Sequence, residues 1–402
     1  MQKINNYFYM IISVLIGAFL LVLILNPTGS QLNVFFAKTD NFLADFFNVQ
    51  LYIADWDPYH NTINGLGEKC YLPFTYLFLE LFNGFFHYSG ATLSDCYASS
   101  EAMVSCLFLM GFSALMLYHS LECIGHFPTR LKFVLFFSSL LLFSVERGNL
   151  IILCVALICY FIAYRNSEVR WKKYSALTAL CVVSVVKIYP AVFGVYLLNE
   201  KRFKDILFCF VLTLLLVFLP FLSFEGGFSN ISQMMTNLSV FSESYSAYKV
   251  FPRFGLAPFF AWGGYLLHLD RSMSDMLLLI PKVIVYSSVI VSLVLFFYEK
   301  VQWKKLALVT LPIIFLPTNS GFYCGLYMLP VLLFFLNNNE GRIMDFIYML
   351  LFCVLLNPVQ IVIHGMTISW MLSNLAMLFL WLLLIIDSFR SWRLTKNTIQ
   401  LV

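Results

Sequence analysis

Long apolar runs recur along the whole chain, and short polar or charged stretches separate them. Crossing the hydrocarbon core of a bilayer takes about 20 apolar residues, so these runs predict transmembrane helices. We expect crossings at Tyr7–Leu25, Ala98–Leu121, Phe133–Val145, Leu150–Tyr164, Asp205–Leu222, Met276–Tyr298, Leu306–Leu316, Phe322–Leu336, Ile343–Ile363 and Ile368–Ile386. Two shorter runs, Phe74–Phe86 and Phe254–Leu267, are predicted to be interfacial or re-entrant helices, although a full crossing would also fit each. The pattern predicts an all-α polytopic membrane protein with about 11–13 transmembrane helices.

Composition supports this class and indicates a single transmembrane domain over residues 1–402. Hydrophobic residues make up 61% of the chain and charged residues 11%, whereas about 25% of the residues of a soluble domain are charged. So few charges cannot cover a water-soluble surface, which excludes a soluble protein. The net charge of +4 is spread over short loops and does not indicate nucleic-acid binding. No small-residue cleavage site follows the first run, so we expect an uncleaved first helix.

Clusters of lysine and arginine predict which loops face the cytoplasm, because positive residues accumulate on that side. They lie at Arg165–Lys173, Lys201–Lys204, Lys300–Lys305 and Arg390–Lys396. Both termini are then cytoplasmic. The first external segment, residues 26–71, is acidic and carries Asp40, Asp45, Asp55, Asp57 and Glu68. Cys70 and Cys96 are predicted to lie on this same side, which allows a disulfide between them.

The run Tyr174–Asn199 has basic loops at both ends, so both ends should lie on the same side. A helix pair broken at Lys187–Pro190 satisfies this condition, because proline lacks a backbone donor and disfavours helix at the preceding residue. Each arm would have roughly a dozen residues, which is too short for a full crossing. The tip would then line a cavity within the membrane. The alternative is one kinked helix with one basic loop on the wrong side.

Polar and ionisable residues near the membrane gather on the predicted external side. Such residues are costly to place there and are functional candidates for that reason. The candidates are Asp45, Asp55, Asp57, Glu146, Arg147, Asn149, Lys187, Tyr189, Arg253, Asn319, Tyr323 and His364. An acidic loop that faces basic residues suits a substrate with both a phosphate and a hydroxyl. Cations bind the phosphate, and a carboxylate accepts the hydroxyl proton as that oxygen attacks.

Five segments, taken in order, carry a resemblance to a known family. They are ADFFNVQLY at Ala44–Tyr52, Asp57–Tyr59, Tyr71–Pro73, Glu146–Asn149 and Lys187–Pro190. In their order and spacing they resemble glycosyltransferase family 87, the C-class (GT-C) membrane transferases that use polyprenyl-phosphate-mannose. Beyond these segments the chain resembles the family only in its general pattern of residues, at Leu316–Asn319, Tyr323 and Pro330.

The resemblance implies a GT-C membrane glycosyltransferase of a bacterial inner (plasma) membrane, with its active site on the extracytoplasmic face. Mannose or another hexose would move from a polyprenyl-phosphate donor to a lipid-linked glycan or envelope glycolipid acceptor, with inversion. Asp45, in a first external catalytic loop at residues 26–71, would be the general base. We expect this loop, the Glu146–Asn149 tip and the Lys187–Pro190 break to converge on one outward-facing cavity.

The resemblance also implies how the phosphate and the acceptor are bound. Lys187 and either Arg147 or Arg253 would neutralise the departing lipid phosphate, where charge develops. His364 would hydrogen-bond the acceptor or the phosphate. No cofactor is expected. No metal is expected either, since Asp55 and Asp57 have no further carboxylate or histidine within reach in the sequence.

Each candidate also has a structural alternative. These are a helix cap for Asp45, an ion pair at a turn for Glu146 and Arg147, snorkelling for Lys187, interfacial anchoring for Arg253 and His364, and a turn and an aromatic belt for Asn319 and Tyr323. Two other functions stay open. A polysaccharide polymerase or ligase would favour a long external loop with histidine, which the 223–253 segment lacks. A transporter or flippase of lipid-linked sugars would favour internal repeats and charges near mid-membrane.

Overall fold

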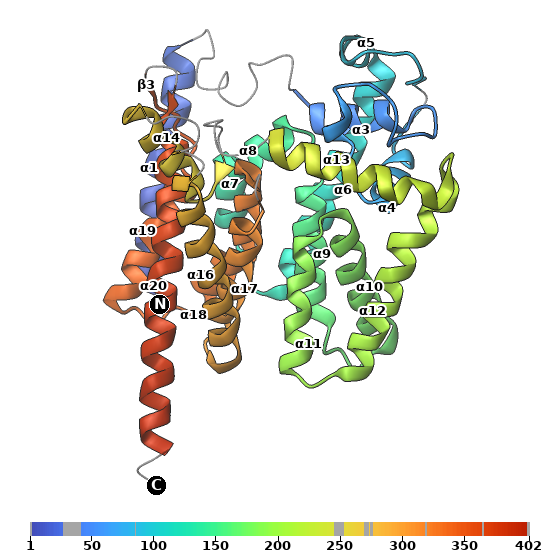
Figure 1. Ribbon diagram of the computed structural model, residues 1–402. Helices are drawn as coiled ribbons and strands as arrows, with labels where there is room; N and C mark the ends of the chain where they lie inside the picture. Colours follow the sequence, from blue (N-terminus) through green and yellow to red (C-terminus); the bar gives the residue numbers. More distant parts are fainter. Residues whose placement is uncertain are drawn as a thin grey trace. The chain divides into compact units, whose positions relative to one another are not determined.

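The computed structural model describes residues 2–26, 42–84, 86–244, 253–268, 273, 276–317, 320–363 and 366–399 (Figure 1). Regular structure in these ranges is almost entirely helical. The described strands form two short antiparallel pairs, β1 (Arg253–Phe254) with β2 (Ser320–Gly321) and β3 (Val362–Ile363) with β4 (Met366–Thr367). Three residues named above, Asp40, Asn319 and His364, lie outside the described residues.

Within the described ranges, five helices are long and apolar enough to cross a membrane. They are α1 (Gln2–Leu25), α6 (Ser100–Ile124), Phe203–Ser223, α16 (Leu279–Tyr298) and the Ile368–Arg393 part of α20 (Ile368–Ile399). Three shorter apolar helices are α9 (Ile151–Tyr164), Phe322–Asn338 and α19 (Ile343–Leu356). All eight lie on predicted crossings, so the all-helical, multi-pass membrane class is confirmed. The predicted crossing Ile343–Ile363 is too long, because α19 ends at Leu356 and Val362–Ile363 is a strand. The number of about 11–13 crossings stays a prediction.

The chain divides into two compact units, each assembled from segments that are distant in sequence. Unit 1 comprises Met1–Phe35, Gly125–Phe143 and Ala247–Val402, and unit 2 comprises Phe36–Ile124 and Ser144–Ser246. The single-domain organisation over residues 1–402 stays a prediction. The two units are described separately below.

In unit 1, α1 packs against α7 (Thr129–Phe136) and α19. The remaining helices are α14 (Ala257–Leu266), α16, α17 (Gln302–Phe315), η5 (Phe322–Met328), α18 (Leu329–Asn338) and α20. Buried aromatic rings join them: Trp303 of α17 lies 5.1 Å from Phe335 and 4.9 Å from Tyr348 between ring centroids. The apolar runs predicted from the sequence are therefore held together by aromatic packing.

In unit 2, α9, α10 (Arg170–Val186) and α12 (Phe203–Phe218) lie side by side, with α6 beside α9 (Figure 1). Short helices gather at one end of this group. They are α3 (Ala44–Ile53), η1 (Leu66–Glu68), α4 (Pro73–Glu80), α5 (Leu93–Ala98), η3 (Leu219–Ser223), η4 (Gly227–Ser229) and α13 (Asn230–Ser244). The candidate site lies at this end.

The predicted break in the run Tyr174–Asn199 is confirmed. Helix α10 ends at Val186, Lys187 is extended at φ −140° and ψ 112°, and the chain continues as η2 (Tyr189–Gly194) and α11 (Val195–Asn199). A break leaves carbonyls of the last turn without helical donors. The Thr75 hydroxyl of α4 donates to one of them, the Val185 carbonyl, at 3.2 Å. Helix α4 therefore stabilises the break from outside.

The two basic loops that flank this run lie together, as their charges predict. The connection between α9 and α10 and the connection between α11 and α12 share ion pairs, Arg165 with Glu200 at 3.0 Å and Lys173 with Asp205 at 3.0 Å. Arg202 also pairs with Asp205, at 2.7 Å. Both ends of the broken run are thus at the same end of unit 2, opposite the short helices (Figure 1).

Three details differ from the sequence-based expectations. The segment Phe133–Val145 is two short helices, α7 and α8 (Ser139–Glu146), because the Ser138 hydroxyl binds the Leu135 carbonyl at 2.7 Å and accepts the Leu141 N–H at 3.3 Å. The predicted loop after η3 contains helix α13. Cys70 and Cys96 are free thiols, so the disulfide that the sequence allowed is not formed.

Candidate active site

Asp45 lies in the first turn of α3, and its carboxylate is held by the Glu146–Asn149 tip. Arg147 Nη2 donates to Asp45 Oδ1, and Asn149 Nδ2 donates to Asp45 Oδ2 at 2.5 Å. Both partners are more than 100 residues away in the sequence. The Asp45 side chain remains 16% exposed, so part of it is accessible. The Asp45 side chain therefore binds the tip. Arg147 forms its ion pair with Asp45, and not with Glu146 as in the structural alternative considered for these two residues.

Backbone hydrogen bonds attach α3 to the same tip. The Leu43 N–H donates to the Glu146 carbonyl at 2.6 Å, and the Asp45 N–H donates to the Arg147 carbonyl at 3.0 Å. Helix N-termini leave donors without helical partners, so tip carbonyls are suitable acceptors here. Leu43 has φ 54°, an uncommon conformation for a leucine. Such strain persists where the surroundings enforce it, often at functional sites.

Gly148 makes this close approach sterically possible. It has φ +61°, and a Cβ atom at this position would meet the Leu43 Cα and the Phe46 Cβ at 3.2 Å. Any other residue at this position would be destabilised twice, by the left-handed backbone conformation and by the close contact of its Cβ atom with α3. The glycine is required because the tip and α3 touch through their backbones.

Asn149 serves two elements at once and is 2% exposed. Its Oδ1 accepts the Ile151 N–H at 2.9 Å, at the start of α9, while its Nδ2 binds Asp45. Because the amide is fixed from the α9 side, its donor direction towards Asp45 is fixed as well. The Asp45 carboxylate is oriented by a rigid helix start.

Glu146 is buried at 5% exposure beside this charged pair, and its Oε2 lacks a hydrogen-bond partner. Burial raises the pKa of Glu146 to about 8; the charge of Arg147 opposes this shift and the charge of Asp45 adds to it. At neutral pH the Glu146 carboxyl is therefore mostly protonated. The tip then carries one carboxyl group in its neutral form next to the Asp45–Arg147 pair.

Lys187, at the break after α10, joins the site through Tyr71. Its Nζ lies 5.2 Å from the centroid of the Tyr71 ring. The charge of Lys187 lowers the pKa of Tyr71, but burial and the charge of Asp45 raise it, with smaller contributions from Cys70 and Glu68, so that the net pKa is raised. Tyr71 is thus within electrostatic range of both Lys187 and Asp45.

Helix α4 connects the two halves of this cluster. Gln50 of α3 donates through Nε2 to the Leu79 carbonyl of α4 at 2.7 Å, and Thr75 of α4 binds the end of α10. The first loop, the tip and the break are therefore brought together in unit 2. The three segments thus meet, as expected from the sequence, whereas the outward-facing cavity stays a prediction.

The segment between α3 and α4 is fixed by two buried polar side chains. Lys69 is 0% exposed, donates to the Ile63 carbonyl and, at 2.6 Å, to the Gly65 carbonyl, and burial lowers its pKa to about 8. Asn237 of α13 is also 0% exposed and donates to the carbonyls of Tyr59 and Lys69 at 3.0 and 3.1 Å. These bonds give the segment a defined path without regular secondary structure.

Asp55 and Asp57 are not part of the Asp45 cluster. They follow the far end of α3, whose last residue, Ile53, lies about 12 Å along the axis from Asp45 at a rise of about 1.5 Å per residue. Asp55 accepts a hydrogen bond from Ser89 at 2.6 Å, and Asp57 pairs with His60 at 2.8 Å. Both are therefore occupied by surface contacts. Within the described ranges, no three His, Cys, Asp or Glu residues form a group that could hold a metal ion.

The remaining candidates fall into three groups. Tyr189 is 37% exposed at the start of η2, next to the break. Arg253 and Tyr323 belong to unit 1: Arg253 is 5% exposed in β1, where burial lowers its pKa, and Tyr323 stacks on Phe143 at 6.1 Å. Asn319 and His364 lie outside the described residues.

Sequence reasoning missed Tyr71, Lys69 and Asn237. Tyr71 lies within one of the five resembling segments, and Lys69 is one of two lysines in a loop with five carboxylates, so both carried a local signal. Asn237 carried none, because its importance depends on carbonyls far away in the sequence.

A carboxylate held by an arginine and an amide, with a lysine nearby, can accept a proton while the cation binds an anion. Together with a multi-pass helical fold, this arrangement suits a membrane transferase.

Comparison with protein families agrees with that class. The model of glycosyltransferase family 87 matches residues 73–317, more than half of the chain. The chain therefore belongs to glycosyltransferase family 87, a GT-C family, and it is a membrane glycosyltransferase. The match includes the Glu146–Asn149 tip and Lys187, whereas Asp45 precedes it. Comparisons with curated proteins and with solved structures gave no match.

Proposed function

We propose that this glycosyltransferase moves mannose or another hexose from a polyprenyl-phosphate donor to a lipid-linked glycan or envelope glycolipid. The reaction takes place on the extracytoplasmic face of a bacterial plasma membrane. The observation that carries the proposal is the Asp45 carboxylate, oriented by Arg147 and Asn149 of the Glu146–Asn149 tip.

In the proposed reaction Asp45 is the general base. An acceptor hydroxyl gives its proton to the carboxylate as the hydroxyl oxygen bonds to the anomeric carbon, and the bond from that carbon to the phosphate oxygen breaks. The anomeric configuration inverts, and the polyprenyl phosphate leaves with the bonding electron pair. A positioned base of this kind contributes about 10²–10⁴-fold to the rate.

Lys187 is the proposed ligand of the departing phosphate. Lysine binds phosphate as a compact point charge, and Lys187 reaches the cluster through Tyr71. Arg147 is instead engaged with Asp45, so its proposed role is to orient the base. Arg253 stays a proposed phosphate ligand, and Asp55, Asp57, Tyr189, Asn319, Tyr323 and His364 stay proposed substrate contacts.

Family membership favours transfer over transport, and it favours this family's chemistry over that of a polysaccharide polymerase or ligase. The donor is tested with the purified protein in lipid vesicles, an acceptor glycolipid extract and one labelled sugar presented in two forms. We expect label transfer from polyprenyl-phosphate hexose and none from the corresponding nucleotide hexose. Transfer from the nucleotide sugar alone would contradict the proposed donor.

A further inference from the structure

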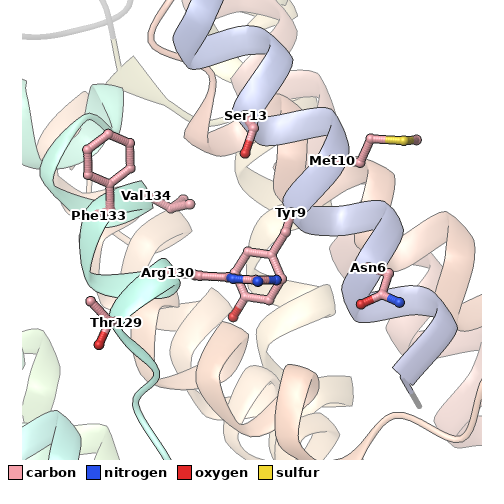
Figure 2. Close-up of a pocket in the computed structure, with 8 residues that line it drawn as sticks. All are labelled: Asn6, Tyr9, Met10, Ser13, Thr129, Arg130, Phe133 and Val134. Atoms are coloured by element: carbon pink, nitrogen blue, oxygen red, sulfur yellow. The ribbon is translucent and has the colours of Figure 1, made fainter.

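Unit 1 contains a groove between α1 and α7 with a volume of about 650 Å³. Figure 2 shows its eight lining residues, Asn6, Tyr9, Met10, Ser13, Thr129, Arg130, Phe133 and Val134. Its volume falls within the about 300–1,000 Å³ that is typical of small-molecule sites. The groove is not part of the Asp45 site, whose residues all belong to unit 2.

The groove is amphipathic along its length. Thr129 and Arg130 of α7 lie at the same end as Asn6 of α1, and the Arg130 side chain extends towards Tyr9 (Figure 2). Phe133 lies further along α7, level with Ser13, and Met10 and Phe133 are 56% and 54% exposed. A polar, cationic end is thus continuous with an apolar wall.

The cation of this groove lies near one end of a candidate span. Helix α1 begins at Gln2, and Arg130 lies beside its first turns, where a cation is placed at the headgroup region and can bind an anion there. None of the eight lining residues is acidic, so the groove supplies no carboxylate for Arg130. The positive charge is therefore complementary to an anion from outside the groove.

We infer that the groove binds an anionic glycerophospholipid of the surrounding bilayer. Arg130 binds the lipid phosphate, for which a guanidinium is suited by its planar set of donors. Asn6 and Thr129 supply further polar contacts at that end, and one acyl chain lies along Met10, Phe133 and Val134. The apolar wall distinguishes this ligand from free phosphate, because it gives an acyl chain a surface for van der Waals packing, which free phosphate lacks.

Native mass spectrometry of the delipidated full-length protein tests this inference. The probes are phosphatidylglycerol, phosphatidylcholine of the same chain length, and glycerol phosphate. The variants are Arg130→Gln, Arg130→Lys and the matched control Lys132→Gln, which removes a charge from the same helix outside the groove. Melting temperatures of the variants verify that each is folded.

We expect wild-type protein and Lys132→Gln to bind one added phosphatidylglycerol, and to bind it more tightly than phosphatidylcholine. Arg130→Gln should bind phosphatidylglycerol about tenfold more weakly, the effect of one lost charged hydrogen bond, and Arg130→Lys should be intermediate. Equal binding by wild type and Arg130→Gln, an equal loss in Lys132→Gln, or binding of glycerol phosphate as tight as that of the whole lipid would overturn the inference.

Discussion

At the scale of single residues, the site depends on how two side chains hold the Asp45 carboxylate. Asp45 accepts from Arg147 and from Asn149, and its own N–H is bonded to the Arg147 carbonyl. Each of these bonds fixes the orientation of Asp45. Orientation matters because a general base must point at the proton that it removes. Glu146 contributes differently, because its carboxyl is buried next to this pair.

Glu146 makes stability depend on pH. An unfolded glutamate releases its proton near 4.5, whereas the folded protein holds it to about pH 8. The folded state therefore binds more protons between these values, and its stability falls as pH rises through this window. We expect the melting temperature of the wild type in detergent to fall more steeply from pH 5 to 8 than that of Glu146→Gln. Parallel curves for the two proteins would contradict a buried, protonated Glu146.

At the scale of elements, the site depends on backbone contact between α3 and the Glu146–Asn149 tip. The motif segments allowed the sequence to predict that these elements meet, and basic loops at both ends predicted the break at Lys187. The sequence did not reveal α13, because its buried positions include Asn230 and Asn237 rather than an apolar stripe. Hydropathy cannot identify a helix whose contacts are hydrogen bonds to remote carbonyls.

The contact between α3 and the tip is tested by Gly148→Ala. A left-handed φ costs a non-glycine residue about 1–3 kcal/mol, and the added Cβ would also press on α3. Gly90→Ala is the matched control, because Gly90 has φ +71° with no atom within 4 Å of a Cβ. We expect Gly148→Ala to lose more unfolding free energy and sugar transfer than Gly90→Ala. Equal effects would show that the close approach to α3 is unimportant.

The path of the first loop is tested by Asn237→Ala. The variant leaves the buried Tyr59 and Lys69 carbonyls without this donor, at about 1–3 kcal/mol for each unsatisfied group. Hydrogen exchange of residues 54–70 should become faster, while exchange in α9 stays unchanged. Thr236→Ala, which removes an exposed hydroxyl bonded within α13, is the control. Unchanged exchange in Asn237→Ala would mean that α13 does not fix the loop.

At the scale of the whole molecule, the account requires the Asp45 end of unit 2 to face outward. The basic loops joined by Arg165 and Glu200 lie at the opposite end. Positive loops are generally retained in the cytoplasm, so the charge distribution predicts this orientation. The wild type serves as the background for labelling, since all ten of its cysteines are free and none is fully exposed.

Labelling of introduced cysteines tests this orientation. A membrane-impermeant maleimide should label Glu225→Cys, at the Asp45 end, in intact cells. It should label Trp171→Cys, in the basic loop, only after permeabilisation. The reverse pattern would place the site on the cytoplasmic face and would exclude the proposed orientation.

The central claim is that Asp45 removes the acceptor proton, and the rate of transfer from labelled polyprenyl-phosphate hexose in lipid vesicles tests it most directly. Asp57 is the rival carboxylate, paired with His60 at the other end of α3. We expect Asp45→Asn to lose about 10²–10⁴-fold in rate with little change in melting temperature. Asp57→Asn, which removes a proposed substrate contact and not the base, should lose far less. Transfer by Asp45→Asn at the wild-type rate, or a comparable loss in Asp57→Asn alone, would contradict the account.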